Sequence, residues 1–272
     1  MFVDTHCHIN IMVKEKFDVP LTQTELTQAH EVLTQAAQHT VTTIINVGTS
    51  VVESNNCIAI AACSPHAYAV VGVHPNDLTD NWRADINAIK EMIKQKQQHR
   101  IVGIGECGFD FHYKDYCKQR QYDAFKEQIE IALEHDLALV VHSRDAYDET
   151  LALLEEFKTD ITRGVMHCFS YDLAFAQQVI EWDFFLGIGG TITYPKNNGL
   201  RNIVQTVPLE KIVLETDAPF LPPQIIRGKK NHPRYIVTIA EFIAQLNNIP
   251  LSTIARTTTA NAHALFGIQE TV

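Results

Sequence analysis

The sequence contains no apolar stretch near the ~20 residues that a bilayer-spanning helix needs, and its longest runs, such as residues 137–141, are strand-sized. The first residues also lack the basic and apolar regions of a secretory signal. Only six of the 272 residues are cysteines and none forms a Cys-x-x-Cys pair, which argues against a disulfide scaffold. We therefore expect a cytoplasmic protein with reduced thiols and no membrane contact.

Basic residues are in deficit as well. The chain has 22 Lys and Arg against 32 Asp and Glu, which gives a formal net charge of −10. This charge argues against broad attraction to nucleic acid or anionic membranes, but it leaves room for a local basic or metal site that holds phosphate. The 46% hydrophobic content can fill a large core, and the 12 Gly and 10 Pro are scattered without forming a linker. We expect a single domain over residues 1–272.

Short apolar or β-branched runs recur along the chain, and helical patterns separate them. Ile86, Ile89 and Ile93, for example, fall on one face of a predicted helix. The candidate strands are residues 2–4, 41–47, 67–73, 101–106, 138–142, 164–167, 184–188 and 212–215. Continuously apolar strands are typical of parallel sheets buried on both faces, so the pattern predicts a TIM (β/α)8 barrel. A doubly wound open sheet is the alternative, but no GxGxxG follows the first run.

Histidines and acidic residues stand at the carboxyl ends of these runs. His6 and His8 are two residues apart, so both imidazoles point to the same face of an extended chain. Other such residues end later runs or directly follow them: Glu106, His142, His167 and Asp217. Because the carboxyl ends of all strands in a parallel barrel open onto one rim, we expect these six side chains to converge.

Four histidines and two carboxylates on one rim predict a metal site rather than packing. Imidazole combined with carboxylate suits Zn, Mn, Fe, Co or Ni, whereas Mg prefers oxygen-rich sites. Six ligands exceed the needs of one open catalytic ion, so two ions sharing a bridging carboxylate fit better. Such a centre activates water for hydrolysis of phosphoesters or amides, and Asp217 can accept the proton of that water.

Motifs along nearly the whole chain resemble those of the TatD-type metal-dependent deoxyribonucleases, a family of amidohydrolase-like barrels. The matching segments are Asp4-Thr-His-Cys-His8, Gly72-Val-His-Pro75, Gly105-Glu-Cys-Gly108, Val141-His-Ser-Arg144, His167-Cys-Phe-Ser170, Glu215-Thr-Asp-Ala-Pro219 and Arg227-Gly-Lys-Lys-Asn231. The set in this order is specific, whereas no single member is. The resemblance implies a nuclease that hydrolyses DNA ester bonds, acting as an exonuclease from a 3′ end.

The resemblance also implies roles for the predicted ligands. The two N-terminal histidines and Asp217 would hold one divalent ion, and His142 and His167 would hold the second. Glu106 would bridge the two ions, which would be Mg, Mn or Zn. By the same resemblance, His74 would contact or polarise the scissile phosphate and Arg144 would bind phosphate nearby.

Two further features concern the substrate. Arg227, Lys229 and Lys230 form the densest basic cluster, which is either a solvated surface or a grip on phosphates next to the cleavage point. Residues 108–111 and 231–233 depart from the usual family pattern. We expect both segments in loops that face the substrate and do not touch the ligands.

Three functions remain open on this core. The first is hydrolysis of DNA, preferably single-stranded or at frayed ends, and residues 227–230 favour it. The second is hydrolysis of a small amide or ester substrate, which the fold alone does not exclude. The third is a non-catalytic metal-binding or interaction protein on a barrel scaffold. No segment predicts an obligate protein partner.

Overall fold

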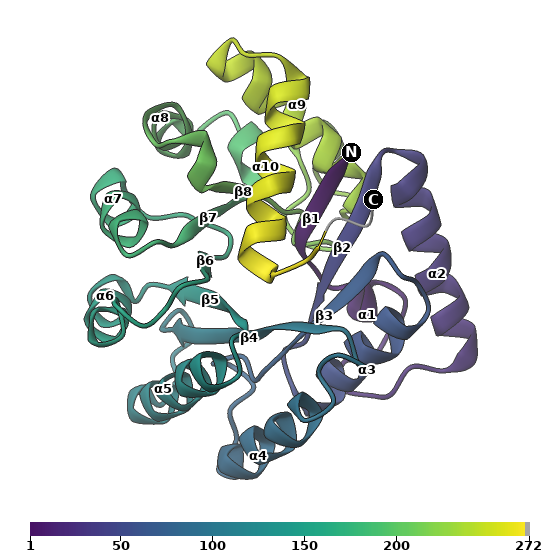
Figure 1. Ribbon diagram of the computed structural model, residues 1–272, viewed down its shortest axis with the longest axis vertical. Coiled ribbons are helices and arrows are strands. Elements are labelled where there is room, and N and C mark those ends of the chain that lie inside the picture. Colours follow the sequence, from purple (N-terminus) through teal and green to yellow (C-terminus); the bar gives the residue numbers. More distant parts are fainter. Residues whose placement is uncertain (270–272) are drawn as a thin grey trace.

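The computed structural model describes residues 1–269, in which parallel strands form a single sheet around a central axis (Figure 1). The strands follow one another in chain order from β1 to β8, and each pairs in parallel with the next. They are β1 (Phe2–Cys7), β2 (Val41–Val47), β3 (Ala67–Val71), β4 (Ile101–Asp110), β5 (Ala138–Arg144), β6 (Gly164–Met166), β7 (Phe185–Ile188) and β8 (Ile212–Leu214).

Helices surround this sheet and bury its outer face. The α-helices are α1 (Ile9–Met12), α2 (Gln23–Gln38), α3 (Val51–Ala62), α4 (Trp82–Ile93), α5 (Lys118–Glu134), α6 (Tyr147–Glu156), α7 (Leu173–Glu181), α8 (Asn198–Thr206), α9 (Ile236–Asn247) and α10 (Leu251–Phe266). Their starts follow local rules: Thr22 and Glu25 form a reciprocal capping box on α2, and the Ser50 side chain caps α3. Among the helices of residues 1–269, none combines the length and the apolar composition that a bilayer crossing requires.

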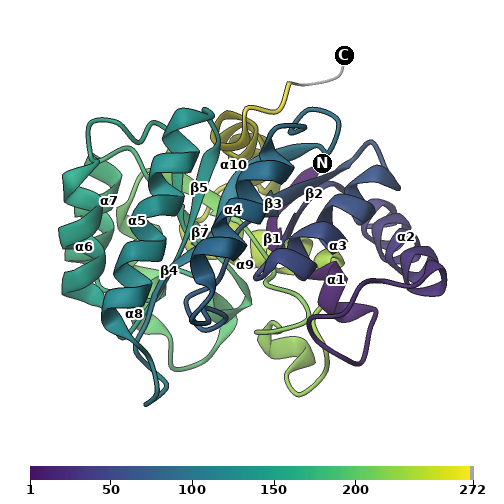
Figure 2. The ribbon, with the colours of Figure 1, turned by 90° about the horizontal axis from the view of Figure 1, so that it is seen from below.

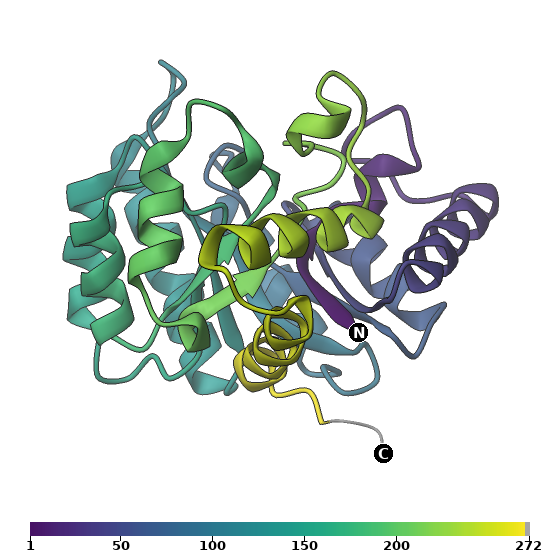
Figure 3. The same ribbon diagram turned by 90° about the horizontal axis from the view of Figure 1, so that it is seen from above.

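Two hydrophobic layers hold the barrel together. The larger one lies between the strands and the surrounding helices, and it includes the predicted stripe of Ile86, Ile89 and Ile93 on α4. The smaller one fills the barrel interior with side chains such as Val70 and Val140, and Leu265 and other α10 residues pack against it. Figures 2 and 3 show α10 at the end of the barrel opposite the long loops that follow β4 and β8. One end is therefore covered, and the carboxyl ends of the strands form the open mouth.

The sheet closes between β8 and β1 through side-chain bonds. Thr5 Oγ1 donates to the Leu214 carbonyl (3.0 Å), and the buried Asp4 carboxylate accepts from both the backbone N–H and the hydroxyl of Thr216 (2.9 and 2.6 Å). Asp217 follows at once, and its backbone N–H donates to the His6 carbonyl (2.8 Å). The closure therefore places the chain segments of two predicted ligands side by side.

The predicted (β/α)8 barrel is confirmed, and the open-sheet alternative is wrong because the last strand returns to the first. The predicted strand positions are confirmed, but several ends differ. The first strand continues to Cys7 and the fourth continues to Asp110. The fourth is longer because residues 107–110 still pair with β5, while the Gln121 side chain accepts the Asp110 backbone N–H (3.0 Å). Most of the segment expected as a loop at 108–111 is therefore strand.

Candidate metal centre

The structure brings all six predicted ligands together at the open mouth of the barrel. His6 lies in β1, Glu106 in β4 and His142 in β5. His8 and His167 directly follow β1 and β6, and Asp217 is the third residue after β8. Pairs of their ligand atoms lie within 4 Å of one another across these strand ends. The convergence expected from parallel strands is therefore found.

One half of the cluster contains the two N-terminal histidines. His6 Nε2 lies 3.2 Å from His8 Nε2 and 3.4 Å from Glu106 Oε2. His8 Nε2 lies 3.3 Å from Asp217 Oδ1 and 3.7 Å from Glu106 Oε2. The Val47 carbonyl lies 2.8 Å from His8 Nδ1 and orients that ring, leaving Nε2 to face the cluster.

The other half is arranged around the second oxygen of the same glutamate. Glu106 Oε1 lies 2.8 Å from His142 Nδ1, 3.5 Å from His74 Nε2 and 3.7 Å from His167 Nε2. The two carboxylate oxygens of Glu106 thus face two separate groups of histidines. Both groups, with Glu106 in common, have ligand atoms close enough together to hold a cation.

The chemistry of these donors fits a divalent cation. Burial disfavours the charged form of Glu106, but His167, His74 and hydrogen bonds from His142 and His6 outweigh it and hold its pKa well below the ordinary value. His6 Nδ1 is buried and finds no hydrogen-bond partner among residues 1–269. Two imidazole nitrogens 3.2 Å apart, facing carboxylate oxygens in a desolvated pocket, are what a cation would satisfy.

The predicted substrate residues lie in different places. His74 and Arg144 line a cavity of about 660 Å³ together with the metal cluster. The Arg227 guanidinium instead lies over the Tyr194 ring at 3.9 Å, and neither Arg227 nor Lys229 lines this cavity. A role for these two residues in substrate binding stays a prediction.

Sequence reasoning missed two carboxylates that support the ligands. Asp110 Oδ2 lies 3.1 Å from His142 Nε2, so the expectation that residues 108–111 do not touch the ligands is wrong. Glu215 Oε1 lies 3.1 Å from His167 Nδ1, although without the alignment of a hydrogen bond, and accepts the Cys168 backbone N–H (2.7 Å).

Both carboxylates favour the charged form of their histidine. Burial alone would lower the pKa of His167, but Glu215 and Glu106 outweigh it and raise the pKa to about 10. Burial acts against protonation of His142 too, and Asp110 and Glu106 raise its pKa above the ordinary value. A signal for Asp110 was present, because residues 106 and 110 fall on the same face of a strand.

A parallel barrel with histidines and carboxylates gathered at its carboxyl mouth places this chain in the class of metal-dependent hydrolases. Residues 3–267 match the TatD related DNase family. The chain belongs to this family, so both the resemblance read from its motifs and the predicted enzyme class are confirmed.

Individual relatives agree with this assignment. The uncharacterized metal-dependent hydrolase YabD of Bacillus subtilis is 33% identical over 268 residues, which cover 98% of this chain and 100% of YabD. The 3′-5′ ssDNA/RNA exonuclease TatD of Citrobacter rodentium is 33% identical over 256 residues, 92% of this chain and 96% of that protein. The crystal structure of YjjV, a TatD homologue from Escherichia coli K12, superposes with a TM-score of 0.87 at 28% identity, covering 98% of each chain.

Proposed function

We propose that this protein hydrolyses phosphodiester bonds of single-stranded DNA or frayed DNA ends, acting from the 3′ end with two divalent ions. The observation that carries the proposal is the position of Glu106, whose two oxygens face two separate groups of histidines. The relative from Citrobacter rodentium, named as a 3′-5′ ssDNA/RNA exonuclease, supports the substrate class and the polarity.

The proposed centre uses the six predicted ligands. His6, His8 and Asp217 would hold one ion, the histidines of β5 and the β6 end would hold the other, and Glu106 would bridge both. Mg, Mn or Zn bound there would lower the pKa of a water molecule and neutralise charge on the phosphate. Asp217 accepts the proton of the attacking water. Burial opposes the charged form of Asp217, but His8 and His167 hold its pKa below the ordinary value, so it is an ionised acceptor.

His74 acts as a neutral donor in this proposal. Burial, followed by the charge of His142, lowers its pKa to about 3, so the ring is uncharged at neutral pH. The backbone N–H of Asn76 donates to His74 Nδ1 (3.1 Å), which assigns the ring proton to Nε2, the nitrogen that faces the centre. His74 can therefore donate a hydrogen bond to a phosphate oxygen. Arg144, exposed at the edge of the same cavity, offers a second, charged donor.

Digestion of end-labelled oligonucleotides tests the proposal. Wild-type protein with Mg, Mn or Zn should shorten a 5′-labelled single strand stepwise, and a chelator should stop the reaction. Glu106→Gln and Asp217→Asn should keep the circular dichroism spectrum and lose at least about 10²-fold in kcat/KM. Normal turnover in either variant at unchanged metal content would contradict its assigned role.

The same purified protein should be offered acyl substrates in parallel. Metal-dependent hydrolysis of amides or carboxylic esters without cleavage of any oligonucleotide would replace the nuclease proposal with the alternative of a small-molecule hydrolase.

A further inference from the structure

Among the cavities that share lining residues with the metal-centre cavity, two meet it at Phe17, and these two differ sharply in character. All three are lined by Phe17, which stands where they meet. One flanking cavity, of about 600 Å³, also shares Thr49, Asn76 and Asp77 with the metal-centre cavity. The other, of about 470 Å³, shares Ile11 and Phe220 with it. A substrate longer than one nucleotide extends beyond the centre, and each of these flanks is one path for it.

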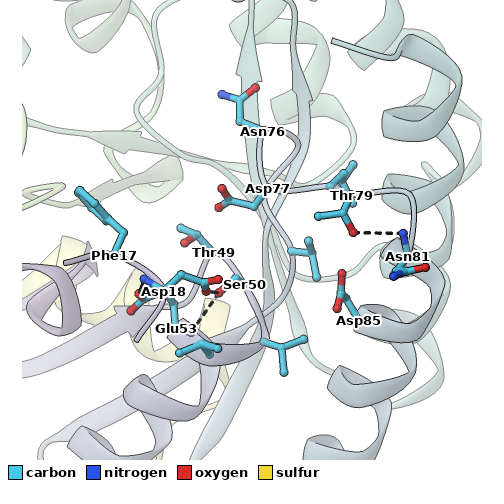
Figure 4. A pocket seen from close by; sticks show the side chains of 14 residues that line it. Phe17, Asp18, Thr49, Ser50, Glu53, Asn76, Asp77, Thr79, Asn81 and Asp85 are labelled. Atoms are coloured by element: carbon cyan, nitrogen blue, oxygen red, sulfur yellow. Dashed lines mark hydrogen bonds between the residues drawn. The ribbon is translucent and has the colours of Figure 1, made fainter. Parts of the chain in front are cut away.

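The first flank is acidic. Asp18, Glu53, Asp77 and Asp85 line it, and among residues 1–269 no lysine or arginine does. Figure 4 shows the Asp18, Asp77 and Asp85 side chains distributed around this cavity, with Phe17 at its edge. Carboxylates in a concave site repel a phosphodiester chain, since each phosphate carries a full negative charge. This flank is a poor path for DNA.

The second flank is aromatic and basic, and we call it the Phe17–Phe220 groove. Phe17 and Phe220 are among the few large apolar side chains left in solvent, 64% and 42% exposed. The Phe220 ring lies 6.0 Å from the ring of His8, so the groove reaches the predicted metal ligands. Two exposed lysines, Lys16 and Lys230, line it as well.

Other charges in the groove leave these two lysines as its available cations. Lys14 also lines the groove, but it is buried and paired with Glu53. Glu15 is the single acidic side chain among the lining residues that the structure describes, so the unpaired charge of the groove is positive. Exposed aromatic rings interleaved with lysines are the combination that binds single-stranded nucleic acid.

We propose that the Phe17–Phe220 groove binds the nucleotides of single-stranded DNA that adjoin the scissile phosphate. Phe17 and Phe220 stack on the unpaired bases, and Lys16 and Lys230 bind the neighbouring phosphates. This inference rests on the proposed nuclease function and adds the path of the substrate.

Stacking has two consequences for specificity. A ring can lie on a base only where that base is unpaired, so duplex ends must fray before they enter the groove. Every base presents a π-face, so the groove discriminates weakly among sequences. The protein should therefore prefer single strands and show little base preference at the groove positions.

The test is a double-mutant cycle that combines removal of an aromatic ring from the protein with removal of bases from the DNA. Phe17→Ala, Phe220→Ala and the double variant are assayed as metal-loaded enzymes on an intact oligonucleotide and on one with abasic sites in the last few nucleotides. We expect KM for the intact strand to rise about 5- to 150-fold per lost ring, the range that base–aromatic stacking supports. Abasic sites should raise the wild-type KM similarly and should have little further effect in the double variant.

Three further variants act as controls. Phe17→Trp keeps a stacking surface and should retain a low KM, which separates stacking from damage to the fold. Ile225→Ala removes an apolar side chain that is 78% exposed and lines neither flank nor the metal-centre cavity, so its KM should equal that of wild type. Lys230→Gln should reduce the slope of log KM against log salt by about one.

The outcomes separate this inference from the function on which it rests. Cleavage of DNA by wild type, with unchanged KM and persistent abasic sensitivity in the Phe17/Phe220 double variant, would overturn the groove and leave the nuclease function standing. Failure of the wild-type enzyme to cleave any oligonucleotide with any of the three metals would overturn both.

Discussion

Asp110→Asn is the sharpest probe of how the centre is supported. The His142 ring lies between two carboxylates, with Nδ1 2.8 Å from Glu106 Oε1 and Nε2 3.1 Å from Asp110 Oδ2. Both carboxylate oxygens of Asp110 accept further hydrogen bonds. Oδ2 also accepts from Asn76 Nδ2 (3.0 Å), and Oδ1 accepts the His112 backbone N–H (2.9 Å). Burial opposes the charged form of Asp110, but these partners hold its pKa well below the ordinary value.

The size of the effect follows from these contacts. Asparagine has one acceptor oxygen, so its amide must face a donor on one side of residue 110, whichever way it turns. A hydrogen bond to a charged group is worth about 1.5–3 kcal/mol and a neutral one about 0.5–1.5 kcal/mol. The loss is therefore about 1–2 kcal/mol, and we expect metal affinity at the His142 half to fall roughly 5- to 30-fold.

Metal affinity can be measured by competition with a chromophoric chelator, without using activity. Asp145→Asn is the matched control, because Asp145 Oδ2 lies 3.0 Å from His112 Nδ1 but both side chains are exposed and neither is a predicted ligand. Equal thermal melts of the metal-free proteins would show that Asp110→Asn retains the fold. A metal affinity of Asp110→Asn within twofold of the wild-type value would refute the supporting role of this carboxylate.

Two more substitutions test packing and pH dependence. A Cβ at Gly187 would lie 2.2 Å from Glu215 Oε2, so Gly187→Ala should displace that carboxylate and lower both the melting temperature and the metal affinity. Gly199→Ala is the control: a Cβ at Gly199 meets open space, so neither quantity should change. Burial raises the pKa of Glu53, but hydrogen bonds from Lys14 and nearby amides outweigh burial and hold the pKa below its ordinary value of 4.5. The contribution of this carboxylate to folding stability is therefore full above pH 4.5 and is lost as the pH falls through the lowered pKa. Glu53→Gln should lower the free energy of unfolding by about 3 kcal/mol at neutral pH and weaken the decrease of the melting temperature at acid pH. If the melting temperature of the variant fell with pH as steeply as that of wild type, this reasoning would be contradicted.

The sequence predicted the strand positions because a parallel barrel buries both faces of every strand, which makes each strand an uninterrupted apolar run. The convergence of the six ligands followed from the same topology, since parallel strands end at one rim. Neither inference required knowledge of side-chain packing. Both could therefore be made from residue types and spacing alone.

Features that depend on loop conformation could not be read in this way. Phe17 lies between β1 and β2 and Phe220 follows β8, more than 200 residues apart in the chain, yet both line one groove. An isolated phenylalanine in a loop gives no sign of whether it packs inward or stays in solvent. The position of Arg227 depends on loop conformation too: its guanidinium lies over the Tyr194 ring, and its predicted phosphate contact stays a prediction.

The spacing of residues 106 and 110 indicates a shared face, but the register of β4 against β5 decides that His142 lies between them. β4 and β5 pair Ile104 with Leu139 and then Cys107 with Val141, so β4 contributes one extra residue between these pairs. This irregularity sets Gly108 opposite His142 and leaves the carboxylates at 106 and 110 on either side of the imidazole. In a regular ladder Cys107 would lie opposite His142, and the side chains of β4 around it would point to the opposite faces of the sheet.

A register irregularity of the same kind occurs in the first strand. β1 and β2 pair Asp4 with Ile44 and then Cys7 with Asn46, so the extra residue lies in the segment that contains His6. The two strands that supply His6 and Glu106 thus each change register where the predicted ligand occurs. Because a one-residue shift moves a side chain to the opposite face of the sheet, these irregularities aim the ligands inward while the preceding apolar residues keep their packing. The geometry of the candidate metal centre therefore depends on the strand register as well as on the residue types of its predicted ligands.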